Sequence, residues 1–288
     1  MINAFISIAV ESVTVILLGT GMPRPNPQAS GPATAIVVGD RVFLVDAGPG
    51  VERQLAAAGL PIDGVTALFV THLHSDHTLG YPDLIFTSWV MGRRQPLQAY
   101  GPHGLKAMTD HLIAAYAEDI RIRTEGLEHQ APEGYRVAVK EIQPGVIYDQ
   151  GGVRVTAVPV PHGNWPEAYA YRFDVGDRSV VISGDTRPSE ALVRASRGVD
   201  VLVHEVYSGA RLEPEARSGD DWPRYMREFH TSDREVGRLA ARIRPGLLVL
   251  SHIIRMGATD EELLRGVREG GFAGRVVVGK DLDRFEVP

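Results

Sequence analysis

The chain has 288 residues, of which 44% are hydrophobic and 23% charged, and its formal net charge is −6. A negative net charge argues against a broad nucleic-acid-binding surface, although it leaves room for a local basic patch. The sequence has no cysteine, which excludes disulfides, thiolate zinc sites and cysteine nucleophiles, so any metal must be held by His, Asp or Glu.

The first residues, MINAFISIAV, do not read as a targeting signal. They lack a basic start, and Glu11 interrupts the apolar stretch before it is long enough to cross a membrane. We therefore expect a cytoplasmic protein without a membrane partner, with export left open. A single large α/β domain can hold a chain of this length, and we expect one domain over residues 1–288.

Runs of β-branched residues are followed by helical patterns, and this order occurs twice along the chain. The first series predicts strands at 13–19, 34–39, 41–48 and 65–72, and helices at 82–91 and 104–118. The second predicts strands at 135–142, 153–161, 168–175, 179–185, 200–205 and 247–252, and helices at 188–196, 232–243 and 259–269. The repeat indicates an α/β fold of two similar halves, with two mixed sheets face to face and helices outside.

The segment 72-HLHSDH-77 contains three of the ten histidines. If it continues the strand before it, His72 and His74 point to the same side and can hold one divalent ion. Asp76 and His77 then lie in the turn that opens the next helix, where they can hold a second ion. A polar loop whose histidines cap that helix is the alternative, but this explanation fits one histidine better than three.

Three further candidate ligands follow apolar strands later in the chain, and they are His162, Asp185 and His252. Together the candidates comprise five histidines and two aspartates, which are enough ligands for two metal ions. Sites of imidazole and carboxylate accept Zn, Mn, Fe or Co. We therefore expect two divalent metal ions, with zinc as the first choice.

The order HxHxDH, lone His, GDT and a last His after an apolar strand resembles the metallo-β-lactamase superfamily, as do 18-LGTG-21 and 44-LVDAGPG-50. The resemblance implies an αβ/βα sandwich with the metals in a groove along the sheet edges. It implies that Asp185 bridges two metals and that Asp46 orients ligands from behind. The remaining ligands would be His72, His74 and His162 on one ion and Asp76, His77 and His252 on the other.

Several segments bear on the branch of the superfamily. Asp185 argues against a true β-lactamase, and His74 argues against a flavodiiron protein. No tyrosine follows Asp185 at a short distance, which argues against a lactonase. The segments 201-VLVHEVYS-208 and 230-HTSDREVG-237 resemble the tRNase Z (RNase Z) branch, in which His230 would act as a general acid held by Glu205.

One departure from tRNase Z concerns the arm that clamps the tRNA. Only residues 163–184 separate His162 from Asp185, which leaves no room for that arm. The insert lies instead at 208–228, and its acidic and mixed composition predicts a lid over a small-substrate site. Aromatic and apolar residues that can line this pocket are Trp165, Trp222, Tyr225 and Met226.

These observations favour hydrolysis of a small phosphodiester, or another small anionic ester, by a hydroxide shared between two metals, with Asp76 as a proton acceptor. The second hypothesis is a tRNA 3′-processing endonuclease, which the basic residues Arg93, Arg94, Arg121 and Arg123 would favour. An arylsulfatase, a lactone or ester hydrolase, and a non-catalytic metal-binding sensor remain as alternatives. Proteins of this kind are commonly homodimers, and we expect the same here.

Overall fold

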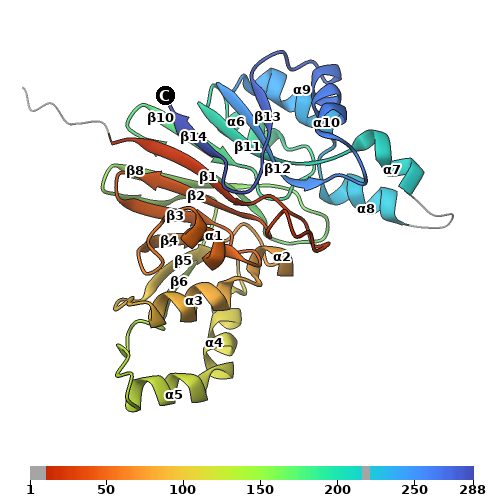
Figure 1. Cartoon of the computed structure of the whole chain (residues 1–288). Coiled ribbons are helices and arrows are strands. Elements are labelled where there is room, and N and C mark those ends of the chain that lie inside the picture. The colour runs from red at the N-terminus through yellow and green to blue at the C-terminus, as the bar shows by residue number, and fades with distance from the viewer. Residues whose placement is uncertain (1–10, 216–220) are drawn as a thin grey trace, which may run out of the picture.

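The computed structural model describes residues 11–215 and 221–288 and consists of two seven-stranded sheets packed face to face (Figure 1). The expectation about a targeting signal rests on residues 1–10, which lie outside the described residues, as do residues 216–220 of the insert. The sandwich with helices on both outer faces confirms the expected fold class.

The first sheet has the order β14-β1-β2-β3-β4-β5-β6. Its strands are β1 (Val13–Gly19), β2 (Ala33–Val38), β3 (Arg41–Val45), β4 (Val65–Phe69), β5 (Leu97–Gly101), β6 (Val137–Glu141) and β14 (Arg284–Val287). The second sheet has the order β13-β12-β11-β10-β9-β8-β7. Its strands are β7 (Gly145–Gln150), β8 (Val153–Pro159), β9 (Tyr169–Val175), β10 (Arg178–Ile182), β11 (Val201–Tyr207), β12 (Leu247–Ile254) and β13 (Val276–Val278).

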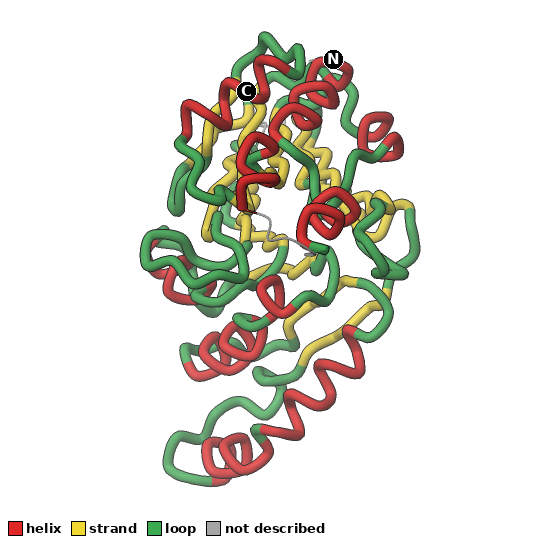
Figure 2. Tube along the Cα trace, turned by 90° about the vertical axis from the view of Figure 1, so that its right-hand side faces the viewer, coloured by secondary structure: helices red, strands yellow, loops and turns green. Residues whose placement is uncertain are grey.

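The helices divide between the two outer faces and the loop regions. The first half contributes α1 (Val51–Ala57), α2 (Ser75–Thr78), α3 (Tyr81–Val90), α4 (Leu105–Ala115) and α5 (Ala117–Glu125). The second half contributes α6 (Glu190–Ala195), α7 (Gly209–Glu215), α8 (Trp222–Phe229), α9 (Asp233–Ile243) and α10 (Asp260–Glu269). Figures 1 and 2 both show α4 and α5 projecting below the sandwich.

Three hydrophobic cores hold the layers together. Aromatic rings fill the space between the sheets, where the centroid of the Phe69 ring lies 5.5 Å from the ring centroids of both Tyr171 and Phe173. A second core packs α1 and α3 against the first sheet, and a third packs α6, α9 and α10 against the second sheet. Burial of apolar side chains on both faces of each sheet explains why the strands read as nearly continuous hydrophobic runs.

Several elements differ from the sequence expectations. The helix expected over 104–118 ends at Ala115, and α5 follows it after Tyr116 without a single buried residue, so no apolar periodicity marks it. The short strands β7, β13 and β14 were not expected either. Among the described residues, no helix is both long and apolar enough to cross a bilayer.

Candidate metal centre

The HxHxDH segment follows β4, but the strand ends earlier than expected, at Phe69. The prediction that His72 and His74 alternate along a strand is therefore wrong, because both lie in the loop before α2. The loop is fixed at Thr71, whose backbone N–H and side-chain hydroxyl donate to the Asp46 carboxylate at 2.7 and 2.9 Å. The Thr71 backbone N–H therefore donates to a side-chain carboxylate instead of to the backbone of a neighbouring strand.

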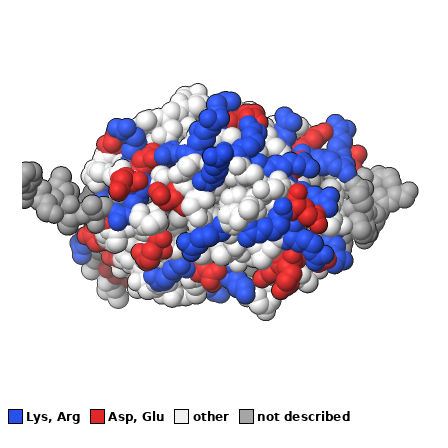
Figure 3. Space-filling model, turned by 90° about the horizontal axis from the view of Figure 1, so that it is seen from above, with Lys and Arg blue, Asp and Glu red and all other residues white. Residues whose placement is uncertain are grey.

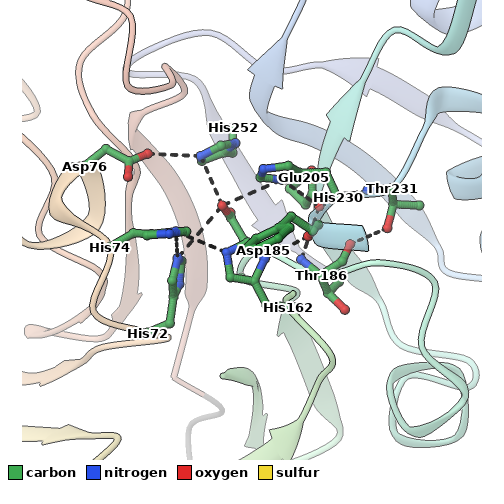
Figure 4. A network of polar contacts seen from close by, with 12 residues as sticks. His72, His74, Asp76, His162, Asp185, Thr186, Glu205, His230, Thr231 and His252 are labelled. Carbon is green, nitrogen blue, oxygen red and sulfur yellow. Dashed lines mark hydrogen bonds and ion pairs between the residues drawn. The ribbon is translucent and has the colours of Figure 1, made fainter. Parts of the chain in front are cut away.

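The first cluster of candidate ligands contains His72, His74, His162 and Asp185. His74 Nδ1 lies 2.9 Å from His72 Nε2 and 3.1 Å from His162 Nε2, and His72 Nε2 lies 4.0 Å from Asp185 Oδ2. Figure 4 shows these side chains converging from separate loops. A divalent ion with bonds of about 2.0–2.1 Å to imidazole nitrogen fits between such donors.

The second cluster contains Asp76, His77 and His252. The Nε2 atoms of His77 and His252 lie 3.7 and 3.3 Å from Asp76 Oδ2, and each lies 3.4 Å from a carboxylate oxygen of Asp185. Asp185 thus faces both clusters. Two buried atoms here, His77 Nε2 and Asp185 Oδ1, lie 3.4 Å apart, but neither forms a hydrogen bond with the described residues, and a cation bound between them would satisfy both.

His252 owes its position to a bulge in β12. Glu205 of β11 is opposite Ser251, whereas the next residue, Val206, is opposite Ile253, so His252 is the extra residue. Its φ of +44° belongs to the left-handed region, which is uncommon outside glycine. A bulge re-aims a side chain out of the regular alternation, and here it presents the imidazole to Asp76 and Asp185.

The electrostatics of the first cluster suit a cation. Burial lowers the pKa of His72 well below its usual range and that of His162 to about 4, so both imidazoles are neutral near pH 7, which is the form that binds metal. Burial by itself would raise the pKa of Asp185, but the imidazoles of His252 and His77 outweigh it and hold that pKa well below its ordinary value. The carboxylate is therefore ionised, although it is buried. Burial alone would lower the pKa of His77 in the second cluster, but Asp185 and Asp46 outweigh it and raise that pKa, so a cation there would replace a proton.

Asp46 lies behind the second cluster. Its Oδ2 lies 2.7 Å from His77 Nδ1 and also accepts a hydrogen bond from the Thr71 hydroxyl. With Nδ1 engaged by a carboxylate, the ring directs Nε2 toward Asp185, and the tautomer is fixed. The backbone of Asp46 has φ +64°, and this turn directly after β3 points the carboxylate inward.

His230 and Glu205 meet at the edge of the clusters. His230 Nδ1 lies 3.3 Å from Glu205 Oε1 and 3.8 Å from Asp185 Oδ2, so His230, Asp185 and His252 also form a group that can hold an ion. Two residues that the sequence reasoning passed over complete the network, because the backbone N–H groups of Thr186 and Thr231 donate to Glu205 Oε1 at 3.1 and 3.0 Å (Figure 4). The signal was present in the segments GDT and HTS, where each threonine directly follows a candidate residue.

His204 takes no part in the clusters. It is buried at the strand end, and its Nδ1 lies 2.7 Å from the carbonyl oxygen of Glu205. Met226, expected to line a pocket, is fully buried against Tyr207, Leu212 and Ile254. Trp165 lies at the rim instead, where its indole N–H donates to His74 Nε2 at 2.9 Å.

The basic residues expected to favour nucleic acid do not form a patch. Arg93 is buried and donates to backbone carbonyls, among them those of Gly134 and Ile85. Arg121 and Arg123 are paired with acidic side chains of their own helix, Glu118 and Asp119.

A different basic region adjoins the candidate metal ligands. A cavity of about 510 Å³ is lined by Arg24, Arg255 and Lys280, together with Ile253, the residue after His252. A neighbouring hollow of about 500 Å³ shares Met22, Pro25 and Asn26 with it and extends to Asp76. Arg255 is paired with Asp260 at 2.6 Å, but no carboxylate of the described residues pairs with Arg24 or Lys280. Cationic groups are thus available within reach of the clusters.

Comparison with known proteins shows similarity along nearly the whole chain. A model described as the beta-lactamase superfamily domain matches residues 41–253. Ribonuclease Z of Mycobacterium marinum (strain ATCC BAA-535 / M) is 34% identical over 282 residues, which cover 96% of this chain and 99% of that protein. Two crystal structures share the fold, each covering 96% of this chain and 99% of its own. They are the metallo-beta-lactamase fold protein YhfI from Bacillus subtilis (TM-score 0.74, 21% identity) and the short form of human tRNase Z (TM-score 0.72, 22% identity).

Proposed function

The chain belongs to the metallo-beta-lactamase superfamily and is a metal-dependent hydrolase of ribonuclease Z and phosphodiesterase type, and on this premise we propose that it is a tRNA 3′-processing endonuclease. The observation that carries the proposal is similarity, over nearly the full length, to proteins named ribonuclease Z. This reverses the order of the two hypotheses drawn from the sequence, in which the missing arm counted against a tRNA substrate. Relatives of matching length are named ribonuclease Z, so the missing arm no longer argues against a tRNA substrate.

The seven candidate ligands fit two ions. His72, His74 and His162 would hold one ion, Asp76, His77 and His252 would hold the other, and Asp185 would serve both. Two divalent ions of the kind bound by imidazole and carboxylate would supply hydroxide near neutral pH and neutralise charge on a phosphodiester.

The chain's own residues would do the remaining work. Asp46 would keep His77 in one tautomer through the 2.7 Å contact to Nδ1. Asp76 would accept a proton from the nucleophile. Glu205 Oε1 lies 3.3 Å from His230 Nδ1, which has no hydrogen-bond partner among the described residues. In this proposal the carboxylate would pair with the protonated ring at Nδ1, and Nε2 would give a proton to the departing 3′ oxygen of the tRNA.

The surface also supports a polyanionic substrate. Figure 3 shows many Lys and Arg side chains on the upper face, with Asp and Glu between them, and α9 and α10 carry the exposed Arg238 and Arg265. Arg24 and Lys280, at the cavity beside the metal ligands, provide cations closer to the centre. Phosphate backbones bind such cations with release of counterions, even to a protein of negative net charge.

In this proposal the insert forms a wall beside the candidate metal site. Of the stretch 208–228, α7 and α8 are described, and α8 ends directly before His230. The oxygen of its last residue, Phe229, lies 2.7 Å from His162 Nδ1. We retain the interpretation of the insert as a lid, within a single domain, as part of the proposal.

The experiment is a comparison of two substrates on metal-loaded protein, a pre-tRNA with a 3′ trailer and bis(p-nitrophenyl) phosphate. We expect a much larger kcat/KM for the pre-tRNA, and loss of both activities in Asp185→Asn. Asp177→Asn is the matched control, because it removes an exposed carboxylate in the β9–β10 turn of the same hairpin. Fast hydrolysis of the small diester with no cleavage of pre-tRNA would return the small-substrate phosphodiesterase to first place.

A further inference from the structure

Tyr225 lies on α8, whose two sides have different surroundings. Met226 faces inward and packs in a small apolar core. Trp222, Tyr225 and Phe229 are spaced three and four residues apart, which places them along one side of the helix. All three are partly exposed, and Trp222 and Tyr225 also pack against the apolar core that contains Met226.

The ring of Tyr225 is clamped between its neighbours. Trp222 stacks on it at 5.5 Å between ring centroids and 16° between planes, and Phe229 at 4.3 Å and 24°. Phe229 is itself fixed, because Gly163 lies so close that a Cβ there would come within 2.0 Å of the Phe229 ring. A phenol held in this way is positioned before any substrate arrives, which reduces the entropic cost of using it.

The ring of Tyr225 borders His230, which lies beside the candidate metal ligands. The ring lies 5.9 Å from that of His230, which is in turn 5.4 Å from that of His162. A tyrosine hydroxyl is protonated near neutral pH, so this phenol can donate a hydrogen bond. No residue in 11–215 or 221–288 forms a hydrogen bond with this hydroxyl. A partly buried tyrosine normally has such a partner.

We propose that the Tyr225 hydroxyl donates a hydrogen bond to a non-bridging oxygen of the scissile phosphate. The proposal rests on the phosphodiester substrate of the proposed function. Non-bridging phosphate oxygens are strong acceptors, and a donor-only contact from a neutral phenol adds no charge to the site.

The test is Tyr225→Phe, which removes the hydroxyl and keeps the stacked ring. Tyr116→Phe is the matched control, because Tyr116 is an exposed phenol whose ring lies 4.3 Å from that of Phe86, but it lies between α4 and α5 away from the candidate metal ligands. Metal content, kcat and KM are measured with bis(p-nitrophenyl) phosphate and with pre-tRNA, and the inhibition constant of inorganic phosphate is measured alongside.

We expect Tyr225→Phe to bind the same amount of metal, to lose about 10- to 100-fold in kcat/KM on both substrates, and to bind inorganic phosphate more weakly. An unchanged kcat/KM and an unchanged phosphate inhibition constant would overturn the proposal, and so would an effect confined to pre-tRNA. The small diester separates the two claims. If pre-tRNA is not cut but diester hydrolysis depends on Tyr225, the function fails and the hydrogen bond stands.

Discussion

Replacement of His230 by asparagine tests the role of the only candidate general acid in the proposed mechanism. Asparagine keeps a donor near the position of Nδ1, which lies 3.3 Å from Glu205 Oε1, but removes Nε2. Glu205 retains the backbone donors of Thr186 and Thr231, so the change does not leave a buried carboxylate without partners. The expected loss is therefore one of chemistry rather than of folding.

A general acid contributes about 10²–10⁴-fold, or about 3–5 kcal/mol of activation free energy. The contribution depends on the leaving group. The 3′ oxygen of a tRNA leaves as a strongly basic alkoxide that needs a proton, whereas p-nitrophenolate is a weak base that departs without one. We expect His230→Asn to lower kcat on pre-tRNA by this factor and on bis(p-nitrophenyl) phosphate by less than about tenfold.

Single-turnover cleavage of end-labelled pre-tRNA and release of p-nitrophenolate measure the two rates. His103→Asn is the control, because His103 also contacts a carboxylate, Glu141 at 3.1 Å, but its side chain is 86% exposed. Equal losses on both substrates, together with loss of one metal ion, would refute the reasoning. His230 would then be a metal ligand, as its grouping with Asp185 and His252 allows.

Asp46→Asn should weaken metal binding by about 10- to 100-fold in a chelator competition, because the charge that fixes the tautomer of His77 is lost, and unchanged affinity would contradict the role given to Asp46. Arg24→Ala and Lys280→Ala should each reduce the slope of log kcat/KM for pre-tRNA against log salt by about 0.7–1, and an unchanged slope would remove the cavity from the RNA-binding surface. Burial raises the pKa of Glu52 to about 7 from 4.5, so the stability it contributes is present below pH 4.5 and lost as the pH rises through 7. In Glu52→Gln the free energy of unfolding should fall less steeply between these pH values, and parallel curves for the two proteins would exclude this effect.

The sequence was sufficient for the layers and for finding the His and Asp residues that the structure brings together, because both depend on strong local signals. Buried strands of β-branched residues are distinctive, and three histidines within six residues have few structural explanations. The short β14 was missed, since it pairs with β1 more than 260 residues away, and its four residues carry little pattern of their own. Its pairing is decided by tertiary packing.

The geometry of the ligands could not be predicted from spacing. His72 and His74 lie in a loop fixed by Asp46, a contact across about 25 residues that no periodicity reveals. His252 depends on a bulge, which inserts one residue without any sequence signature of its own. The choice between a small diester and RNA as substrate depends on surface loops, whose shape the sequence does not give. The cavity beside the candidate metal ligands is lined by Arg24 and Lys280, not by the arginines that stood out in the sequence. The homodimer stays a prediction.

The measurement that tests the central claim most directly is mapping of the ends produced from a pre-tRNA with a 3′ trailer by the metal-loaded protein. The account predicts one cut at the junction of the tRNA and its trailer, a 3′-hydroxyl on the tRNA, and no cut after chelation or in Asp185→Asn. Intact pre-tRNA under conditions in which bis(p-nitrophenyl) phosphate is hydrolysed would contradict it.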